Sequence, residues 1–431
     1  MLHRSLALWF FAAGCGSPVL PDFPDAASLD AAISPRDAAM ARSDSGVEVG
    51  RTCSATRVLD DVPEPVQAVH LASFGDRVAL GFTLDLVAPH ALMARVGDGE
   101  TFGAPLLVFP DVRSDFGPRD IAVSADGKAG FAATDLASGY RRVITAEPAQ
   151  LGMISTFGRT SGCYSPMVGA VTHFIHATGH PRGEAPDGVD WARSTGSAWA
   201  TTGTVGFDAV GAVACDLAVE LGGNGGAVWG GGSSRFAVRA FRDNVPAGPT
   251  YTATVPIANI TVVRATAAGD GSVSVIIGGD QKLYEIFFTV AGERLVPSPP
   301  VLIEGVSASD RMDLISDPQG NVTLAWYGND NLYVRRKLSG VWRDVQLIGE
   351  LGGMIDRQPF LRVHASGEVA LLYAAASGTW LQTARRDSPT FAPQTRVKES
   401  PYTASMAYLG DKRILVAWPT LGDILGVYCE D

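Results

Sequence analysis

The segments DPQGNVTLAWYG (317–328) and HASGEVALLYAA (364–375) each join a small turn containing Gly to a short apolar run. The same arrangement, with Gly or Asp in the turn, returns in FGDRVALGF (74–82), SADGKAGFAAT (124–134), AGDGSVSVIIGG (268–279) and LGDKRILVAW (409–418). Steps of about 45 to 50 residues separate the copies, which is the length of a four-stranded propeller blade. The repeat therefore predicts an all-β chain built from such blades.

The strands of each repeat are expected to lie between neighbouring blades, with both faces buried. Runs such as VTLAWYG (322–328) are accordingly apolar throughout. The following segment, NLYVRRKLSGVWRDVQLI (331–348), reads as two strands joined at its LSG turn. Eight units of this kind can be traced, at 65–108, 114–157, 162–204, 207–250, 257–303, 307–348, 357–397 and from 400 onward.

The eighth unit is incomplete, and residues 51–62 have no unit of their own. Ring-closing propellers complete the last blade with an N-terminal strand, which removes an exposed sheet edge. We therefore expect a β-propeller of eight blades, each of four antiparallel strands, closed by the N-terminal strand. Seven blades are the alternative, if the third or fourth unit is an insertion.

The chain contains five cysteines. Without Cys15, four remain, and these allow three pairings. Cys53 opens the folded domain and Cys429 nearly ends it, whereas Cys163 and Cys215 lie about one repeat apart. The repeat geometry therefore predicts the disulfides Cys53–Cys429 and Cys163–Cys215.

The first residues read as an export signal. His3 and Arg4 precede the apolar run LALWFFAAG (6–14), which is too short to span a bilayer. The sequence Ala12-Ala13-Gly14-Cys15 resembles the lipobox of bacterial lipoproteins, although Ala12 stands where Leu is favoured. The resemblance implies a signal peptide at 1–14 and a lipidated Cys15. Gly16, in place of Asp, implies an outer-membrane lipoprotein or one at the cell surface. A plainly secreted or periplasmic protein is the alternative.

Residues 16–50 are rich in Pro, Ala, Asp and Ser and show no strand or helix periodicity. Such a composition cannot bury enough apolar surface to offset its ordering entropy. We therefore expect a disordered tether at 16–50 and the propeller domain at 51–431.

Composition excludes one class of partner. The formal charge is −11, and charged residues make up 18% of the chain. Because phosphate binding needs clustered Lys and Arg, and no basic stripe is present, nucleic acid is excluded.

The repeats loosely resemble BNR or sialidase-type blades. The Asp-box of that family is approximated by Ser124-Ala125-Asp126-Gly127 and by Ser316-Asp317-Pro318-Gln319-Gly320, with imperfect spacing in both. The box is structural in that family, so the resemblance implies a propeller of about residues 51–431 and transfers no catalytic residue.

Arginines near the start of the first strand of several units form a candidate ligand site. Such positions rim the channel of a propeller, and converging guanidinium groups suit a carboxylate or phosphate. Nearby Asp residues make ion pairs between blades the alternative. Trp191 and Trp199 are candidates for stacking on sugars. The four arginines are Arg119, Arg264, Arg311 and Arg357.

Three histidines cluster at 173–180. On a strand, residues three apart face opposite sides, so only His176 and His180 share a face and form a candidate metal pair. A solvated loop with scattered histidines is the alternative reading, and we expect no other cofactor.

These observations predict a membrane-tethered lipoprotein whose propeller binds a protein or glycan without catalysis, as a monomer. The alternative is a carbohydrate-active enzyme, a sialidase-like hydrolase or lyase acting on acidic sugars. No catalytic residue can be assigned from the sequence.

Overall fold

The chain separates by its internal contacts into Met1–Val47 and Glu48–Asp431. The computed structural model describes part of the second unit. The described residues are 50–62, 64–84, 90–113, 116–159, 167–169, 174–179, 188–194, 199–207, 214–305, 311–328, 330–350, 358–399 and 404–431. They form strands and no helix, and so no helix among them could cross a membrane.

The described strands form eight antiparallel sheets, which we call blades 1 to 8 in chain order. The inner strands are β3 (Val66–Phe74), β7 (Ile121–Val123), β12 (Val168–Gly169), β16 (Ala214–Val219), β20 (Val262–Ala267), β25 (Met312–Ser316), β30 (Phe360–Val363) and β34 (Ser405–Tyr408). The second strands are β4 (Arg77–Leu84), β8 (Ala129–Thr134), β13 (Phe174–Gly179), β17 (Gly225–Gly230), β21 (Val273–Gly279), β26 (Val322–Gly328), β31 (Val369–Ala375) and β35 (Ile414–Pro419).

The third strands are β5 (His90–Gly97), β9 (Tyr140–Glu147), β14 (Gly188–Ser194), β18 (Arg235–Arg242), β22 (Lys282–Ala291), β27 (Asn331–Leu338), β32 (Gly378–Ala384) and β36 (Asp423–Glu430). The outer strands of blades 1 to 7 are β6 (Leu106–Val112), β10 (Gln150–Leu151) with β11 (Ser155–Arg159), β15 (Trp199–Phe207), β19 (Val245–Thr254), β23 (Arg294–Pro297) with β24 (Val301–Leu302), β28 (Val341–Trp342) with β29 (Gln346–Glu350), and β33 (Thr395–Lys398). The outer strands of blade 8 are β1 (Thr52–Cys53) and β2 (Arg57–Asp61).

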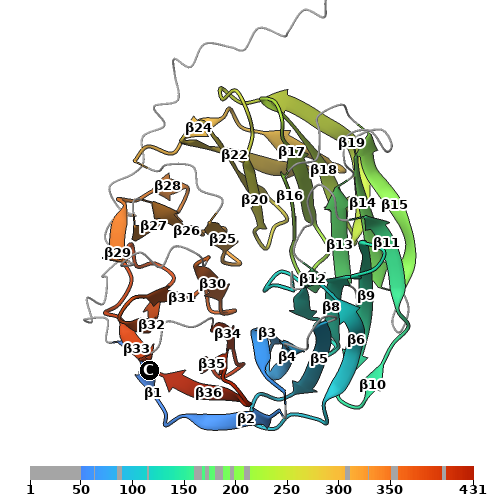
Figure 1. The fold of residues 1–431 in the computed structure, drawn as a ribbon. Coiled ribbons are helices and arrows are strands. Elements are labelled where there is room, and N and C mark those ends of the chain that lie inside the picture. Colours follow the sequence, from blue (N-terminus) through green and yellow to red (C-terminus); the bar gives the residue numbers. More distant parts are fainter. Residues whose placement is uncertain are drawn as a thin grey trace, which may run out of the picture. The chain divides into compact units, whose positions relative to one another are not determined.

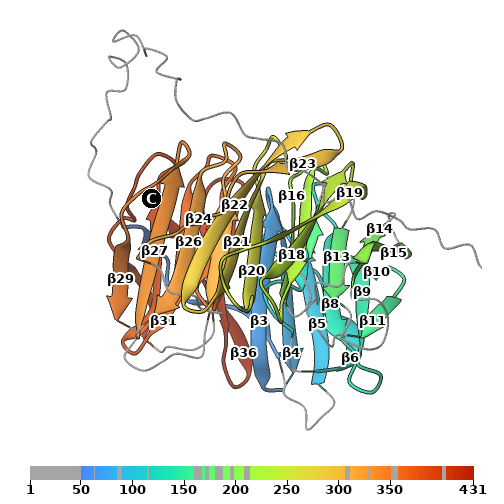
Figure 2. The same cartoon turned by 90° about the horizontal axis from the view of Figure 1, so that it is seen from above.

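The sheets form a closed ring. Each inner strand contacts the inner strands of the two neighbouring blades, and β34 of blade 8 contacts β3 of blade 1. Figure 1 looks down the ring, with the inner strands around its centre, and Figure 2 shows the same sheets from the side. The prediction of an eight-bladed propeller is confirmed, and the third and fourth units form blades of their own.

The repeated turn joins the inner strand to the second strand, and six blades share one geometry. In blade 6, the N–H of Asp317 donates to the carbonyl of Asn321, and that of Gly320 donates to the carbonyl of Asp317. This is a three-residue hairpin loop, in which the last loop residue adopts a left-handed conformation. Gly320 has φ of 85°, whereas Lys412 fills the equivalent place in blade 8 at 72°. The turn therefore favours Gly without requiring it.

Side chains four residues before this turn connect neighbouring inner strands. Asp216 accepts the N–H of Ala265 in the next blade at 2.9 Å, and Asp313 accepts that of Leu361 at 2.8 Å. Ser405 accepts the N–H of Leu71 at 2.9 Å, across the junction of blades 8 and 1. These contacts, which we call the inner latches, satisfy main-chain donors that no sheet partner reaches.

The apolar core lies between the blades. Val369–Ala375 is buried along its whole length, as are Gly225–Gly230 and Val273–Gly279 in other blades. One core cluster combines residues of blades 4 and 5, and another combines residues of blades 8 and 1. Burial on both faces explains why these runs are apolar throughout rather than alternating.

Blade 8 is completed by the beginning of the described chain. β1 and β2 both pair with β36, so the N-terminal strands supply the outer edge of the last sheet. In Figure 1 the blue N-terminal strands lie beside the red C-terminal strand. Cys53 and Cys429 are paired across this seam and form a disulfide, with their Cα atoms 4.0 Å apart, as predicted.

The second predicted disulfide is only partly within the described residues. Cys215 is disulfide-bonded, and it is buried on β16. Cys163 lies outside the described residues, so the pairing of Cys163 with Cys215 stays a prediction.

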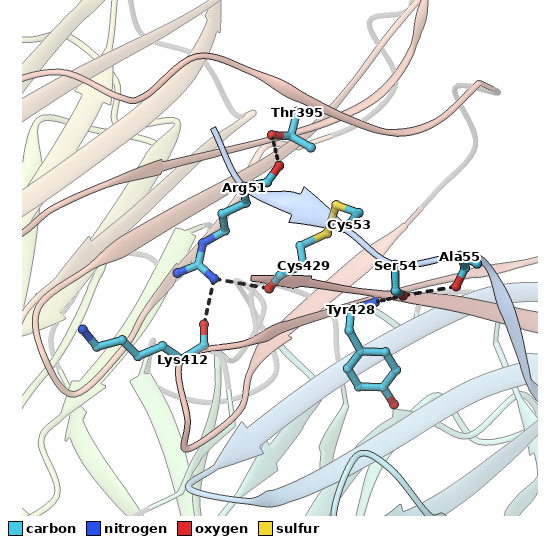
Figure 3. The surroundings of a disulfide bond; sticks show 8 residues. All are labelled: Arg51, Cys53, Ser54, Ala55, Thr395, Lys412, Tyr428 and Cys429. Carbon is cyan, nitrogen blue, oxygen red and sulfur yellow. Dashed lines mark hydrogen bonds between the residues drawn. A yellow bond between two sulfur atoms is a disulfide. The ribbon is translucent and has the colours of Figure 1, made fainter. Parts of the chain in front are cut away.

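Arg51 holds the seam from the side of the N-terminal strands. Its guanidinium donates to the carbonyls of Lys412 at 2.9 Å and Cys429 at 3.2 Å, and it forms a buried ion pair with Glu368. Glu368 belongs to blade 7 and also accepts a hydrogen bond from the hydroxyl of Tyr408 at 2.8 Å. Figure 3 shows the seam, in which Thr395 binds the carbonyl of Arg51. Arg51 therefore ties blade 7, blade 8 and the closing strand together.

Replacing both Cys53 and Cys429 by Ser should lower the free energy of unfolding. The disulfide spans 376 residues, so its loss frees nearly the whole unfolded domain. Chain-entropy arguments then give a destabilisation of about 2–5 kcal/mol. Urea denaturation followed by tryptophan fluorescence measures the change. An unchanged midpoint would show that strand pairing alone closes the ring.

Arg51→Ala should destabilise the domain by about 3–5 kcal/mol, because it leaves the buried Glu368 carboxylate without its cation. Arg386→Ala is the matched control, since Arg386 forms an exposed ion pair with Asp387 and should leave the midpoint of unfolding unchanged. Equal midpoints for the two variants would contradict a closing role for Arg51.

Candidate functional site

A cavity of about 440 Å³ lies on the axis of the ring, and we call it the axial cavity. Every blade contributes to its wall through its inner strand or the residues next to that strand. The lining residues are Ala72–Phe74, Pro118, Arg119, Ile121–Val123, Met167–Gly169, Asp216, Ala265, Asp313–Ile315, Leu361–Val363 and Tyr408. The axial position follows from ring closure, because the inner strands surround the cavity.

A second cavity of about 580 Å³ lies at the end of the inner strands that carries the repeated turns, and we call it the mouth. It shares four lining residues with the axial cavity: Ser73, Phe74, Val363 and Tyr408. The two cavities therefore adjoin each other, and we call them together the hollow. Its wall includes the turns of blades 4 to 8.

The charged side chains at the mouth are engaged by their own turns. Glu220 accepts hydrogen bonds from the main chain and side chain of Asn224, and Asp317 does the same with Asn321. What the mouth offers a ligand is therefore mainly apolar surface, including Phe74, Val219, Leu221, Pro318 and Leu409.

The two carboxylates that line the axial cavity, those of Asp216 and Asp313, both take part in inner latches. Both oxygens of Asp216 accept main-chain N–H groups, from Leu217 at 3.0 Å and Ala265 at 2.9 Å. Asp313 likewise accepts from Leu314 at 3.1 Å and from Leu361 at 2.8 Å. Burial raises the pKa of Asp216, while nearby guanidinium groups and these N–H donors oppose the shift.

Two guanidinium groups line the axial cavity. Arg119 lies just before β7, and its Nη1 atom is 3.6 Å from Asp216, beyond hydrogen-bonding distance. Arg362 lies on β30 and donates to the carbonyl of Leu361 at 2.8 Å. Burial lowers the pKa of Arg362; the charge of Asp313 opposes this shift, and that of Arg119 adds to it. The two arginines are therefore close enough to repel each other.

Those of the four predicted arginines that the structure describes occupy different places. Arg119 lines the axial cavity, but Arg264 donates to the carbonyls of Val263 and Met312, between blades 5 and 6. Arg311 is described and directly precedes β25, while Arg357 lies outside the described residues. The arginines stand at different distances from the following turn. Arg119 is five residues before Ser124, whereas Arg264 is four before Ala268.

The predicted tryptophans lie against the core. The Trp199 side chain is 8% exposed and belongs to a cluster with residues of blades 2 and 3. Trp191 is half-buried, and its ring packs edge-on against Phe241 with centroids 5.9 Å apart. Stacking on a sugar needs an exposed ring, whereas Trp199, the first residue of β15, is buried against blade 2.

The predicted metal pair is largely outside the described residues. His176 lies on β13, and its side chain is not described; His180 falls outside the described residues. Within the described part of the chain, no group of three His, Cys, Asp or Glu residues is placed to hold a metal ion.

Sequence reasoning missed Arg362 and the latch aspartates. The signal for the latches was present, since the strands CDLAV (215–219) and MDLIS (312–316) share an Asp-Leu pair. No repeated pattern marks Arg362, because the neighbouring blades have no arginine two residues before their turns.

His70 is a buried histidine on β3, in the first blade. It is 4% exposed, and its ring packs edge-on against Phe116 with centroids 5.3 Å apart. Burial lowers the pKa of His70 to about 3, and the charge of Arg362 acts in the same direction. The folded protein therefore keeps this imidazole neutral.

Stability should fall as the pH drops below the unfolded pKa of His70, about 6.5. The unfolded state then binds a proton that the folded state excludes, so His70 costs about 3 kcal/mol of unfolding free energy between pH 6.5 and pH 4. His70→Gln should flatten this part of the pH profile, measured by urea denaturation at each pH. Parallel profiles for the variant and the natural protein would contradict the burial of a neutral His70.

Solved β-propellers resemble this chain. The Dos1 propeller aligns with a TM-score of 0.55 at 11% identity, covering 88% of this chain and 95% of that one. Sqt1 of Chaetomium thermophilum, bound to the N-terminus of ribosomal protein L10, aligns with a TM-score of 0.50 at 12% identity, covering 86% and 98%. No family model and no curated protein matches the sequence. At such identities the likeness shows the fold alone, which is that of a β-propeller.

Proposed function

We propose that this chain is a membrane-tethered extracytoplasmic protein whose propeller binds a protein partner at its mouth, without catalysis. The observation that carries the proposal is the pair of adjoining cavities on the ring axis, which extend to the turns and are lined mainly by apolar side chains. Ligand sites are typically concave and apolar, with a few polar groups that fix orientation.

The polar groups of the hollow favour binding over catalysis. A general acid or base must reach the proton that it transfers, and its carboxylate must be available. The latch carboxylates Asp216 and Asp313 already accept two main-chain N–H groups each. This argues against a sialidase-like hydrolase or lyase that uses them.

A protein segment fits better than a glycan. Sugar recognition relies on exposed aromatic faces, and Trp199 is buried. The propeller of Sqt1 was solved with a protein N-terminus bound, and an extended protein segment is the ligand class proposed here.

Tethering is proposed from the lipobox-like sequence at 12–15. The Cys53–Cys429 disulfide supports export, because disulfides persist in oxidising compartments. We propose the cell envelope as the location, with the lipid on Cys15 at the outer membrane or cell surface, and a monomeric propeller.

Growth of a bacterial producer with radiolabelled palmitate tests the anchor. The natural chain should carry label and sediment with membranes, and Cys15→Ser should do neither, because no other thiol lies in the lipobox-like sequence. Cys53→Ser is the control and should keep its label. Release of unlabelled natural protein into the medium would instead support plain secretion.

Site-specific photocrosslinking in the native host tests the binding face. A benzoylphenylalanine in place of Leu221, which lines the mouth and is 47% exposed, should capture a discrete protein. The same group in place of Val341, which is 56% exposed on the outer strand β28, should not. Identical adducts at both positions would contradict a partner at the mouth, and retention on a glycan array would favour a sugar ligand.

A further inference from the structure

Two guanidinium groups and two carboxylates line the axial cavity, and the carboxylates are directed to the main chain. The guanidinium of Arg119 approaches Asp216 to 3.6 Å, and the charges of Asp313 and Arg119 both act on the buried guanidinium of Arg362. Both aspartates direct their oxygens to main-chain N–H groups, so neither is arranged as a bidentate partner of a guanidinium.

Arg119 and Arg362 are the two arginines that line the cavity. A guanidinium offers five N–H donors. Among the described residues, the Arg119 side chain approaches Asp216 to 3.6 Å, and Arg362 donates one hydrogen bond to a carbonyl. Most of their donors therefore remain available to a ligand in the cavity.

These donors lie next to the mouth. Arg362 directly precedes Val363, which lines both the axial cavity and the mouth. Around the arginines the wall is apolar, with Ile121, Met167, Leu314 and Ile315. A group that fits this environment combines an apolar stem with a carboxylate at its end.

We propose that the axial cavity binds a carboxylate of the partner segment between Arg119 and Arg362, with the rest of the segment seated in the mouth. The inference rests on the proposed function and adds the chemistry of recognition. The carboxylate would relieve the repulsion of two cations inside the ring and accept their free N–H donors. An acidic sugar would bring several hydroxyl groups into a wall that offers them few side-chain partners.

The test uses three five-residue peptides and the purified propeller. The first is acetyl-Ala-Val-Glu-Val-Ala-amide, the second has Gln in place of Glu, and the third is the Gln peptide with a free C-terminal carboxylate. Hexanoate serves as a free carboxylate without a peptide chain. Isothermal titration at low salt measures each dissociation constant.

We expect one of the two carboxylate peptides to bind at least tenfold more tightly than the neutral Gln peptide, and the better one identifies a side chain or a chain end as the source. Arg119→Gln and Arg362→Gln should each remove that preference. Arg242→Gln is the control, since it makes the same charge change at a partly exposed site on β18 and should preserve the preference. Arg119 lies outside the strands, so its variant tests the site even if Arg362→Gln does not fold.

Equal affinity for all three peptides would overturn the carboxylate site while leaving a protein ligand at the mouth intact. Absence of binding up to millimolar peptide would also overturn it, and the Leu221 crosslink would then decide the proposed function separately. Hexanoate binding as tightly as the best peptide would assign the site to a free carboxylate and overturn the role of a protein segment.

Discussion

Closure of blade 8 is the constraint on which the rest of the structure depends. Every inner strand is held by neighbours on both sides, so one open junction would leave two sheets with an uncovered face. The junction combines the pairing of β1 and β2 with β36, the Cys53–Cys429 disulfide and the buried Arg51–Glu368 pair. Only a closed ring places all eight inner strands around one cavity, and the candidate site is therefore a product of the seam.

The same geometry explains the electrostatics of the axis. An inner strand has a sheet partner on one side only, so its other main-chain donors must be satisfied by side chains. Asp216 and Asp313 supply this in two blades, and for Asp216 the cost is a buried charge. Arginines accompany them, and because the carboxylates serve the main chain first, part of the positive charge is left facing the cavity.

The fold was largely predictable, because its determinants are local and repeated. The repeated turn, with Gly at its left-handed position in most copies, marks the end of six described inner strands, and the incomplete eighth unit indicates how the ring closes. The Cys53–Cys429 pair follows from these two features.

The candidate site was less predictable than the fold, because the direction of a side chain depends on its position relative to the turn. Arg264 occupies the latch position and contacts the next blade, whereas Arg362, two residues nearer its turn, lines the cavity. Only the three-dimensional arrangement separates the two.

The proposed tether gives the seam a second role. A lipid on Cys15 would connect through residues 16–50 to Arg51, which is the residue that enters the closing strand. Any pull on the anchor would then act on β1, the two-residue strand at the edge of the last sheet. The few hydrogen bonds of so short a strand open readily under force. The disulfide from Cys53 to Cys429 on the third strand, β36, bears the force instead. A propeller that is closed by its N-terminus and anchored by the same end therefore has a physical reason to place a disulfide at this position.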